Sequence, residues 1–126
     1  ELSGTPTVNG AIDGGGGTNT LRFSGPGSFD RDLASFQVVV KDGAGTFILP
    51  QLAVRRTLTM LGGTLQVGTL GVMDNTSAFE ALVKPDGAHG LLRATNSVVL
   101  DGGLTVLRTG GFYRPARSVV RVTSRL

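Results

Sequence analysis

Residues 58–67 read LTMLGGTLQV and contain two short alternating segments on either side of a glycine pair. In each segment two apolar residues are separated by one other residue, Leu58 with Met60 and Leu65 with Val67. Side chains of a strand point alternately to its two faces, so this spacing is typical of half-buried strands. The glycine pair between them allows a sharp turn. The stretch therefore predicts a strand–turn–strand unit in which these two apolar pairs face a core.

This unit recurs along the chain. One series of apolar pairs follows Gly-Thr or Gly-Gly, with separations of 26, 18 and 39 residues: Leu21/Phe23, Phe47/Leu49, Leu65/Val67 and Leu104/Val106. A second series has separations of 20, 21, 19 and 22 residues: Val38/Val40, Leu58/Met60, Phe79/Ala81, Val98/Leu100 and Val120/Val122. Glycine-rich turns separate the pairs. A strand–turn–strand unit of about twenty residues cannot bury its apolar side alone, which indicates a stacked solenoid.

Among solenoids of this period, a short right-handed parallel β-helix with a C-terminal cap is predicted, in an all-β chain. The leucine-rich-repeat consensus is absent from the sequence. An antiparallel sandwich of hairpins remains the alternative, because it also shows short strands at regular spacing. The near-constant second series favours the β-helix. The predicted core residues share the inward position of the two series: Leu58, Met60, Leu65, Val67, Phe79, Val98, Leu100, Leu104, Val106, Val120 and Val122.

The order of three segments resembles bacterial autotransporter passengers with a pertactin-like β-helix. These segments are NTLRFSGPGSF (19–29), FQVVVKDGAGTFIL (36–49) and LTMLGGTLQV (58–67). Residues 77–107 are similar to the last passenger segment of that family, the autochaperone region, and residues 110–126 resemble its closing strands. A composition shift at residues 71–79, where Gly-Thr repeats give way to arginines, indicates a boundary between regular rungs over residues 1–72 and rungs with a cap over residues 73–126, in one continuous solenoid. The resemblance implies that the second part is autochaperone-like. Phe112 and Tyr113 are then expected to cover the closing end.

What the resemblance implies for function is a non-catalytic passenger segment, found on the bacterial cell surface or outer membrane, or secreted. The β-helix is expected to act as a stalk, and its C-terminal part as the nucleus of folding and secretion. The implied partner is the protein's own C-terminal outer-membrane β-barrel, which this chain does not contain. An adhesin-type module for a host glycan or protein is the second hypothesis, with residues 23–32 (FSGPGSFDRD) as the binding loop.

The composition excludes several classes of protein. The chain of 126 residues is one domain or a piece of one, and 20 of them are glycine. Absence of cysteine excludes a disulfide scaffold and cysteine-ligated metal sites. No apolar run approaches the length of a membrane helix, and residues 1–4 lack the pattern of a signal peptide. The net charge is +3, with five arginines and no acid from Arg108 onward. We interpret these arginines as a charged edge that resists unwanted strand pairing. Few aromatic residues lie nearby to stack on bases, so no nucleic-acid partner is expected.

The sequence contains few candidate catalytic residues. His89 is the single histidine, and no Gly-x-Ser-x-Gly elbow accompanies it. Asp30 and Asp32 are the only closely spaced carboxylates, and on a strand they would point the same way. A polysaccharide-active β-helix is therefore a third and weaker hypothesis, since aromatic sugar platforms are nearly absent. No catalytic residue, cofactor or metal is predicted.

The stretch DGGGGTNTLRF (13–23) partly matches the calcium-binding β-roll repeat. Asn19, however, stands where that repeat has an aspartate, and only one copy is present. Calcium prefers several oxygen ligands with carboxylate charge. A phosphate loop would require a following Lys and Ser or Thr. We therefore expect a glycine corner that leads into a strand from Thr20 to Phe23.

Overall fold

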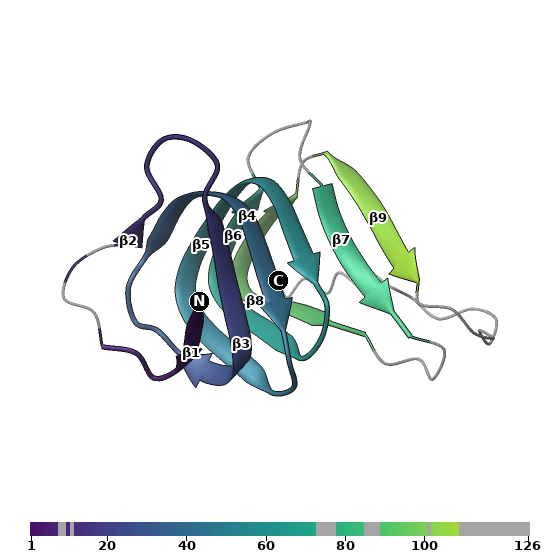
Figure 1. Ribbon diagram of the computed structural model, residues 1–126, viewed down its shortest axis with the longest axis horizontal. Helices are drawn as coiled ribbons and strands as arrows, with labels where there is room; N and C mark the ends of the chain where they lie inside the picture. Colours follow the sequence, from purple (N-terminus) through teal and green to yellow (C-terminus); the bar gives the residue numbers. More distant parts are fainter. Residues whose placement is uncertain (8–9, 11, 73–77, 85–88, 101, 109–126) are drawn as a thin grey trace.

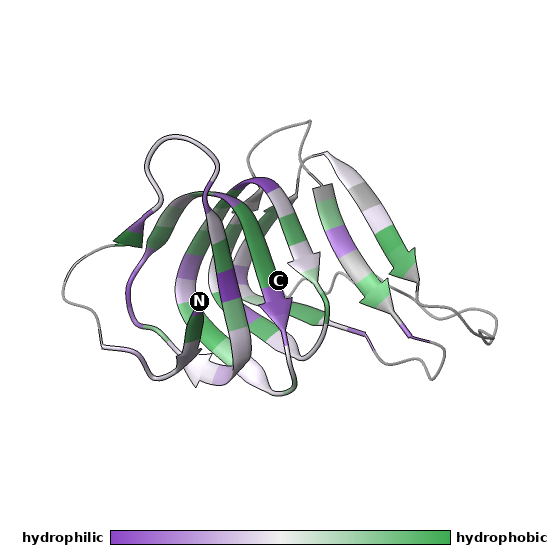
Figure 2. Cartoon of the chain, viewed as in Figure 1, coloured by the Kyte–Doolittle hydropathy of each residue, from purple (hydrophilic) through white to green (hydrophobic). Residues whose placement is uncertain are grey.

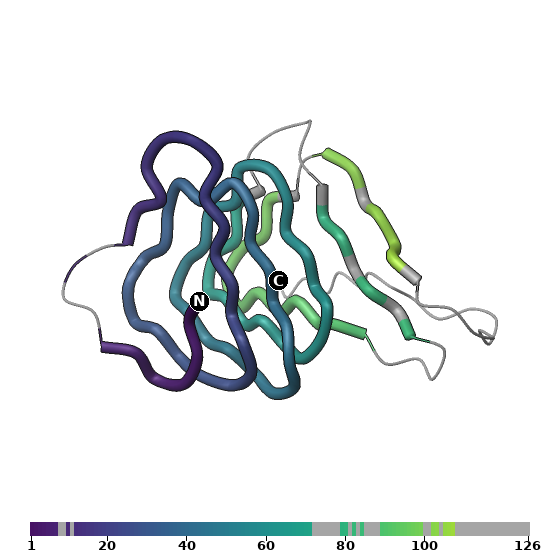
Figure 3. The backbone as a smooth tube through the Cα atoms, in the orientation of Figure 1, coloured from purple at the N-terminus to yellow at the C-terminus, as the bar shows by residue number. Residues whose placement is uncertain are grey.

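The computed structural model describes residues 1–7, 10, 12–72, 78–84, 89–100 and 102–108. These residues form parallel strands and no helix, so none of them belongs to a helix that could cross a membrane. The chain winds in stacked coils of similar outline, about four turns in all (Figures 1 and 3). Its strands are β1 (Leu2–Gly4), β2 (Ile12–Asp13), β3 (Thr20–Ser28), β4 (Leu33–Asp42), β5 (Thr46–Met60), β6 (Thr64–Val72), β7 (Ala78–Val83), β8 (Leu91–Leu100) and β9 (Gly103–Arg108). The predicted all-β parallel β-helix is thereby confirmed.

The longest strand, β5, passes through three stacks of parallel strands. Residues 46–49 (stack A) lie between β3 and β6, and residues 51–54 (stack B) lie between β4 and β6. Residues 57–60 (stack C) lie between β4 and β7. Strand β8 extends stacks A and B beyond β6, and β9 extends stack C beyond β7. Each coil therefore hydrogen-bonds only to the coils before and after it.

The core is built by placing like side chains in register from coil to coil. Phe47 pairs with Leu65 in stack A, and Leu52 pairs with Leu70 in stack B, and all four are buried. Burying one such side chain stabilises the fold by about 1.5–3 kcal/mol. Figure 2 shows the resulting alternation of hydrophobic and hydrophilic residues along the strands. Aromatic contact adds to the core near the first coils, where the rings of Phe23 and Phe47 lie 4.7 Å apart between centroids.

The predicted core is buried in the middle coils. Leu58, Met60, Leu65 and Val67 have no exposed surface, and Phe79 is partly buried against them. For Leu100 and Leu104 the structure describes the backbone pairing, with Val72 and Phe79 respectively. Val120, Val122, Phe112 and Tyr113 lie outside the described residues.

The prediction that Val98 and Val106 are buried is wrong, because 43% and 41% of their surfaces are exposed. Val98 pairs with the buried Leu70, and Val106 pairs with Ala81, so each continues a stack. Within the described part of the chain, however, β8 and β9 pair along one edge only. A residue in the last coil of a stack is covered from one side, which explains the exposure.

The second repeat series differs from the structure at two places, by one residue of register at Val38/Val40 and by a change of stack at Val98/Leu100. Val39 and Lys41, not Val38 and Val40, are buried and pair with Leu58 and Met60. Val98/Leu100 pairs with Leu70/Val72 in stack B, whereas the partners of Phe79/Ala81 are Leu104/Val106. The division of the chain after residue 72 stays a prediction, although strands before and after it pair with each other.

Candidate functional site

Glycines occupy the corner between stacks C and A in consecutive coils. Gly43 has a φ of 70° and Gly63 a φ of 66°, a region that glycine adopts without strain. The corners touch through their backbones, since a Cβ on Gly63 would lie 2.4 Å from the carbonyl oxygen of Gly43 and 2.5 Å from that of Gly45. The amide of Thr64 donates a 2.9 Å hydrogen bond to the Gly45 carbonyl. Successive corners are therefore held in direct contact.

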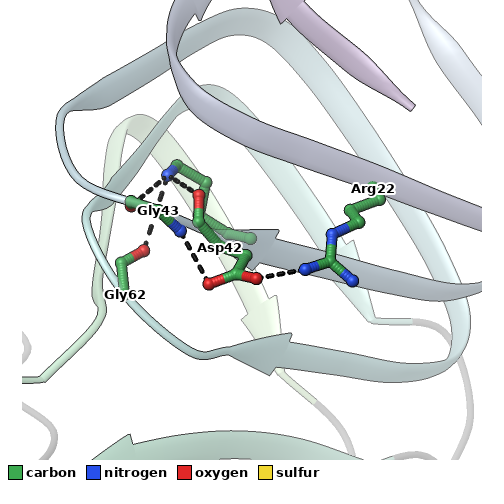
Figure 4. A network of polar contacts seen from close by, with 5 residues as sticks. Arg22, Asp42, Gly43 and Gly62 are labelled. Atoms are coloured by element: carbon green, nitrogen blue, oxygen red, sulfur yellow. Dashed lines mark hydrogen bonds and ion pairs between the residues drawn. The ribbon is translucent and has the colours of Figure 1, made fainter.

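Lys41 lies beneath this corner, at the inward position between Phe23 and Met60 in stack C. Its side chain is fully buried. The Nζ atom donates to the main-chain carbonyl oxygens of Asp42 at 2.7 Å, Gly43 at 3.0 Å and Gly62 at 3.5 Å (Figure 4). An ammonium without such partners would be costly in an apolar interior. Burial lowers the pKa of Lys41, and the neighbouring Asp42 carboxylate opposes that shift.

The Asp42 carboxylate faces outward and connects the corner to the surface. One oxygen accepts a 2.7 Å hydrogen bond from the Gly43 amide, and the other forms an ion pair with Arg22 of the preceding coil (Figure 4). The Arg22 and Asp42 side chains are 47% and 36% exposed, so the pair contributes at most about 1 kcal/mol. Three consecutive coils, represented by Arg22, Asp42 and Gly62, are joined in one polar network.

Sequence reasoning missed Lys41. A signal was present, because the Gly-rich turns that follow Lys41 and Met60 place both residues just before a corner. Aligning the two turns assigns Lys41 to the inward column of Met60. The register was not evident because residues 38–40 are all valine. Without an alternating polar residue, the sequence does not show which of them face outward.

A shallow hollow of about 430 Å³ lies at the next corner, between stacks A and B. Its walls include Ser28, Ile48 and Gln66, which are register partners in three consecutive coils. The corner residues of the same coils complete it: Asp30, Pro50 and Gly68, with Thr95 in the following coil. The hollow therefore runs from coil to coil, and it combines hydroxyl, amide and carboxylate groups with the aliphatic surfaces of Ile48 and Pro50.

The glycine run at residues 13–19 forms a corner in which the side chains of Asp13 and Asn19 hydrogen-bond to its main chain. Asp13 Oδ1 accepts a 2.9 Å hydrogen bond from the Gly15 amide, which lowers the pKa of Asp13. The Asn19 side-chain amide donates to the Gly16 carbonyl at 3.1 Å. Strand β3 begins at Thr20, as predicted, and Leu21 and Phe23 are buried. Among the described residues no group of three or more His, Cys, Asp or Glu side chains is placed to hold a metal.

The expectation that Asp30 and Asp32 point the same way on a strand is wrong. Residues 29–32 connect β3 to β4 and are not in a strand, and both carboxylates are exposed. Asp30 lies 3.7 Å from the guanidinium of its neighbour Arg31. His89 is also exposed and lies in an isolated bridge. The sequence brings the two aspartates close along the chain, but the corner does not align them across a cleft.

The expected binding loop at residues 23–32 is mostly strand. Residues up to Ser28 belong to β3, and Phe23 and Phe29 are buried. A Cβ on Gly27 would lie 2.0 Å from the carbonyl oxygen of Gly4, so the backbone there packs closely against the first coil. Only the connection 29–32 is free of strand structure, and it borders the hollow at Asp30.

Comparison with known proteins identifies no relative. No protein-family model matches the chain. No curated protein and no solved structure matches it either. The chain's own sequence and geometry are therefore the basis for inferring its function.

Proposed function

We propose that this chain is a non-catalytic segment of a bacterial autotransporter passenger, exposed at the cell surface, where its β-helix acts as a stalk. The observation that carries the proposal is a buried core that continues through consecutive coils, with partners such as Phe47 and Leu65 in register. A stack of this kind lengthens coil by coil without a change of plan, which suits a spacer. The order of the segments between residues 19 and 67, which resembles such passengers, supports the same function.

The C-terminal part, residues 73–126, has the role of folding nucleus in this proposal, next to the protein's own outer-membrane barrel. Strand β7 pairs with β5, and β8 pairs with β6, so the later coils offer a complete strand edge to the earlier ones. In a solenoid a formed coil templates its neighbour, because contacts run between adjacent repeats. A chain that emerges from the membrane with this end first would therefore fold outward from it.

The proposal is tested by placing the chain between a secretion signal and an autotransporter barrel, and by probing display on intact cells with protease. Phe79→Asp puts a carboxylate on a residue of the later coils that packs against the core. Val99→Asp is the matched control in the same part of the chain, since Val99 is 62% exposed. We expect the parent and the control to yield a protease-resistant surface fragment and Phe79→Asp to yield none. Equal display of all three would contradict the nucleus role.

A surface-binding module is the second candidate, and the hollow between stacks A and B favours it. Ser28, Gln66 and Thr95 offer hydrogen-bonding groups beside the aliphatic Ile48 and Pro50, a combination suited to a saccharide or an extended peptide. A glycan array probed with the chain and with Gln66→Ala tests this function. Thr105→Ala, an exposed change in stack C, is the control. Binding that is lost only in Gln66→Ala supports a binding module, and an array without signal argues against it.

A further inference from the structure

We propose that the main-chain carbonyls of Asp42, Gly43 and Gly62 form a site for a monovalent N–H-donating cation, which Lys41 fills with its own ammonium. A small alkylammonium ion is the class of ligand that fits when that side chain is removed. The three acceptors come from two consecutive coils, so the bound cation joins one coil to the next. This property is independent of the stalk function proposed above.

The number of carbonyl acceptors equals the number of N–H groups on the ammonium. An ammonium has three N–H groups and no acceptor, and three carbonyl oxygens lie 2.7–3.5 Å from Nζ. No carboxylate is among these partners: the Asp42 carboxylate binds the Gly43 amide and Arg22. The positive charge is therefore held by peptide dipoles in a fully buried position, as a bound cation would be.

The site is formed by the backbone and not by the lysine. Gly43 and Gly63 turn their corners with positive φ, and the Gly63 backbone lies against the carbonyls of Gly43 and Gly45. A Cβ on Gly63 would lie 2.8 Å from the Lys41 Nζ, so the missing side chain leaves the space that the ammonium occupies. The carbonyl cage should therefore persist when the side chain at position 41 is shortened.

The test uses the full chain with Lys41→Ala and added n-propylammonium, which replaces the three missing carbons and the amine. We expect a saturable rise in the folding equilibrium constant, about elevenfold at ten times the dissociation constant. Lys41→Met is the matched control, because the methionine side chain fills the space that the lysine methylenes occupy and leaves no room for n-propylammonium. Propanol has no charge and tetramethylammonium has no N–H, so neither should stabilise Lys41→Ala. Equal effects on the parent and both variants, or no effect at all, would overturn the proposal.

A measurement on the parent protein decides the question if Lys41→Ala does not fold under any condition. The chain has two lysines, Lys41 and Lys84, and Lys84 is exposed. We expect the ¹⁵N–¹H NMR spectrum of the amines to show one ammonium signal protected from solvent exchange, and we expect Lys84→Arg to keep that signal. Rapid exchange of both amines would refute a caged ammonium.

Discussion

Lys41 and Met60 are register partners in neighbouring coils, and both side chains are fully buried. A cation thus occupies a column that is otherwise built of apolar residues, with Phe23 on its other side. The column tolerates it because the corner above supplies three carbonyl oxygens. Replacing Met60 would remove apolar packing, whereas replacing Lys41 would also remove the donor to the carbonyl oxygens.

Lys41→Ala is expected to destabilise the fold by about 2–5 kcal/mol, the range for truncating a long buried side chain. It removes the packed methylene stem and also leaves the carbonyl cage without a donor. Lys41→Met keeps most of the volume but also leaves these carbonyls without a donor, so we expect it to be destabilised, although less than Lys41→Ala. Urea unfolding of the three proteins measures the difference, and a Lys41→Ala midpoint equal to that of the parent would contradict the packing role.

The stability of the parent relative to Lys41→Met should depend on alkaline pH. Burial lowers the pKa of Lys41 below its ordinary value of 10.5 in the folded state, while Asp42 limits the shift and Arg22 in turn pairs with Asp42. Between the folded pKa and 10.5 the unfolded chain binds the proton and the folded chain does not, so stability rises with pH across that window. Urea midpoints measured from pH 7 upward test this, and parallel curves for the two proteins would disprove it.

Gly63→Ala should be strongly destabilising, by more than about 2 kcal/mol, since it combines a positive φ with backbone overlap. The new Cβ would meet the carbonyl oxygens of Gly43 and Gly45 at 2.4 and 2.5 Å. Gly62→Ala is the adjacent control, because its nearest neighbour would lie at 3.7 Å and no positive φ is required. Thermal melts should show a large loss for position 63 and a small change for position 62.

Asp13→Asn should reduce the sensitivity of the fold to acid. The Gly15 amide holds the pKa of Asp13 below its ordinary value of 3.8, so its stabilising effect is present above that pH and is lost as the pH falls through the folded pKa. Melting temperatures of parent and variant should converge at low pH and differ most at neutral pH. A constant difference at all pH values would show that the carboxylate charge is not the cause.

Leu65→Asp should abolish cooperative folding, because it buries a carboxylate without a partner in the centre of the core. Val99→Asp, at a position 62% exposed, should change the free energy of unfolding by about 0.5 kcal/mol or less. Far-ultraviolet circular dichroism during urea titration distinguishes the two. A cooperative transition in Leu65→Asp at the parent midpoint would mean that Leu65 does not face the core.

The repeated strand units, the solenoid that they favour and the core of the middle coils could be predicted from the sequence. Alternation at period two and glycine-punctuated units are local properties, so Leu58, Met60, Leu65 and Val67 were readable as inward residues. The glycine corner before Thr20 is also a local feature of the sequence. It was preferred to a calcium loop because Asn19 lacks the carboxylate charge that calcium prefers.

Which units stack on which, and therefore which residues meet, is set by contacts between coils that are distant in sequence. A slip of one residue moves every side chain of a strand to the opposite face, and the register is set by hydrogen bonds to a neighbouring coil that is distant in sequence. Lys41 faces inward because its strand is aligned with Met60 and because the corners of two coils provide acceptors for it. Val98 is exposed although it continues the column of Leu70, since burial depends on a further coil and not on the alternation within its own strand.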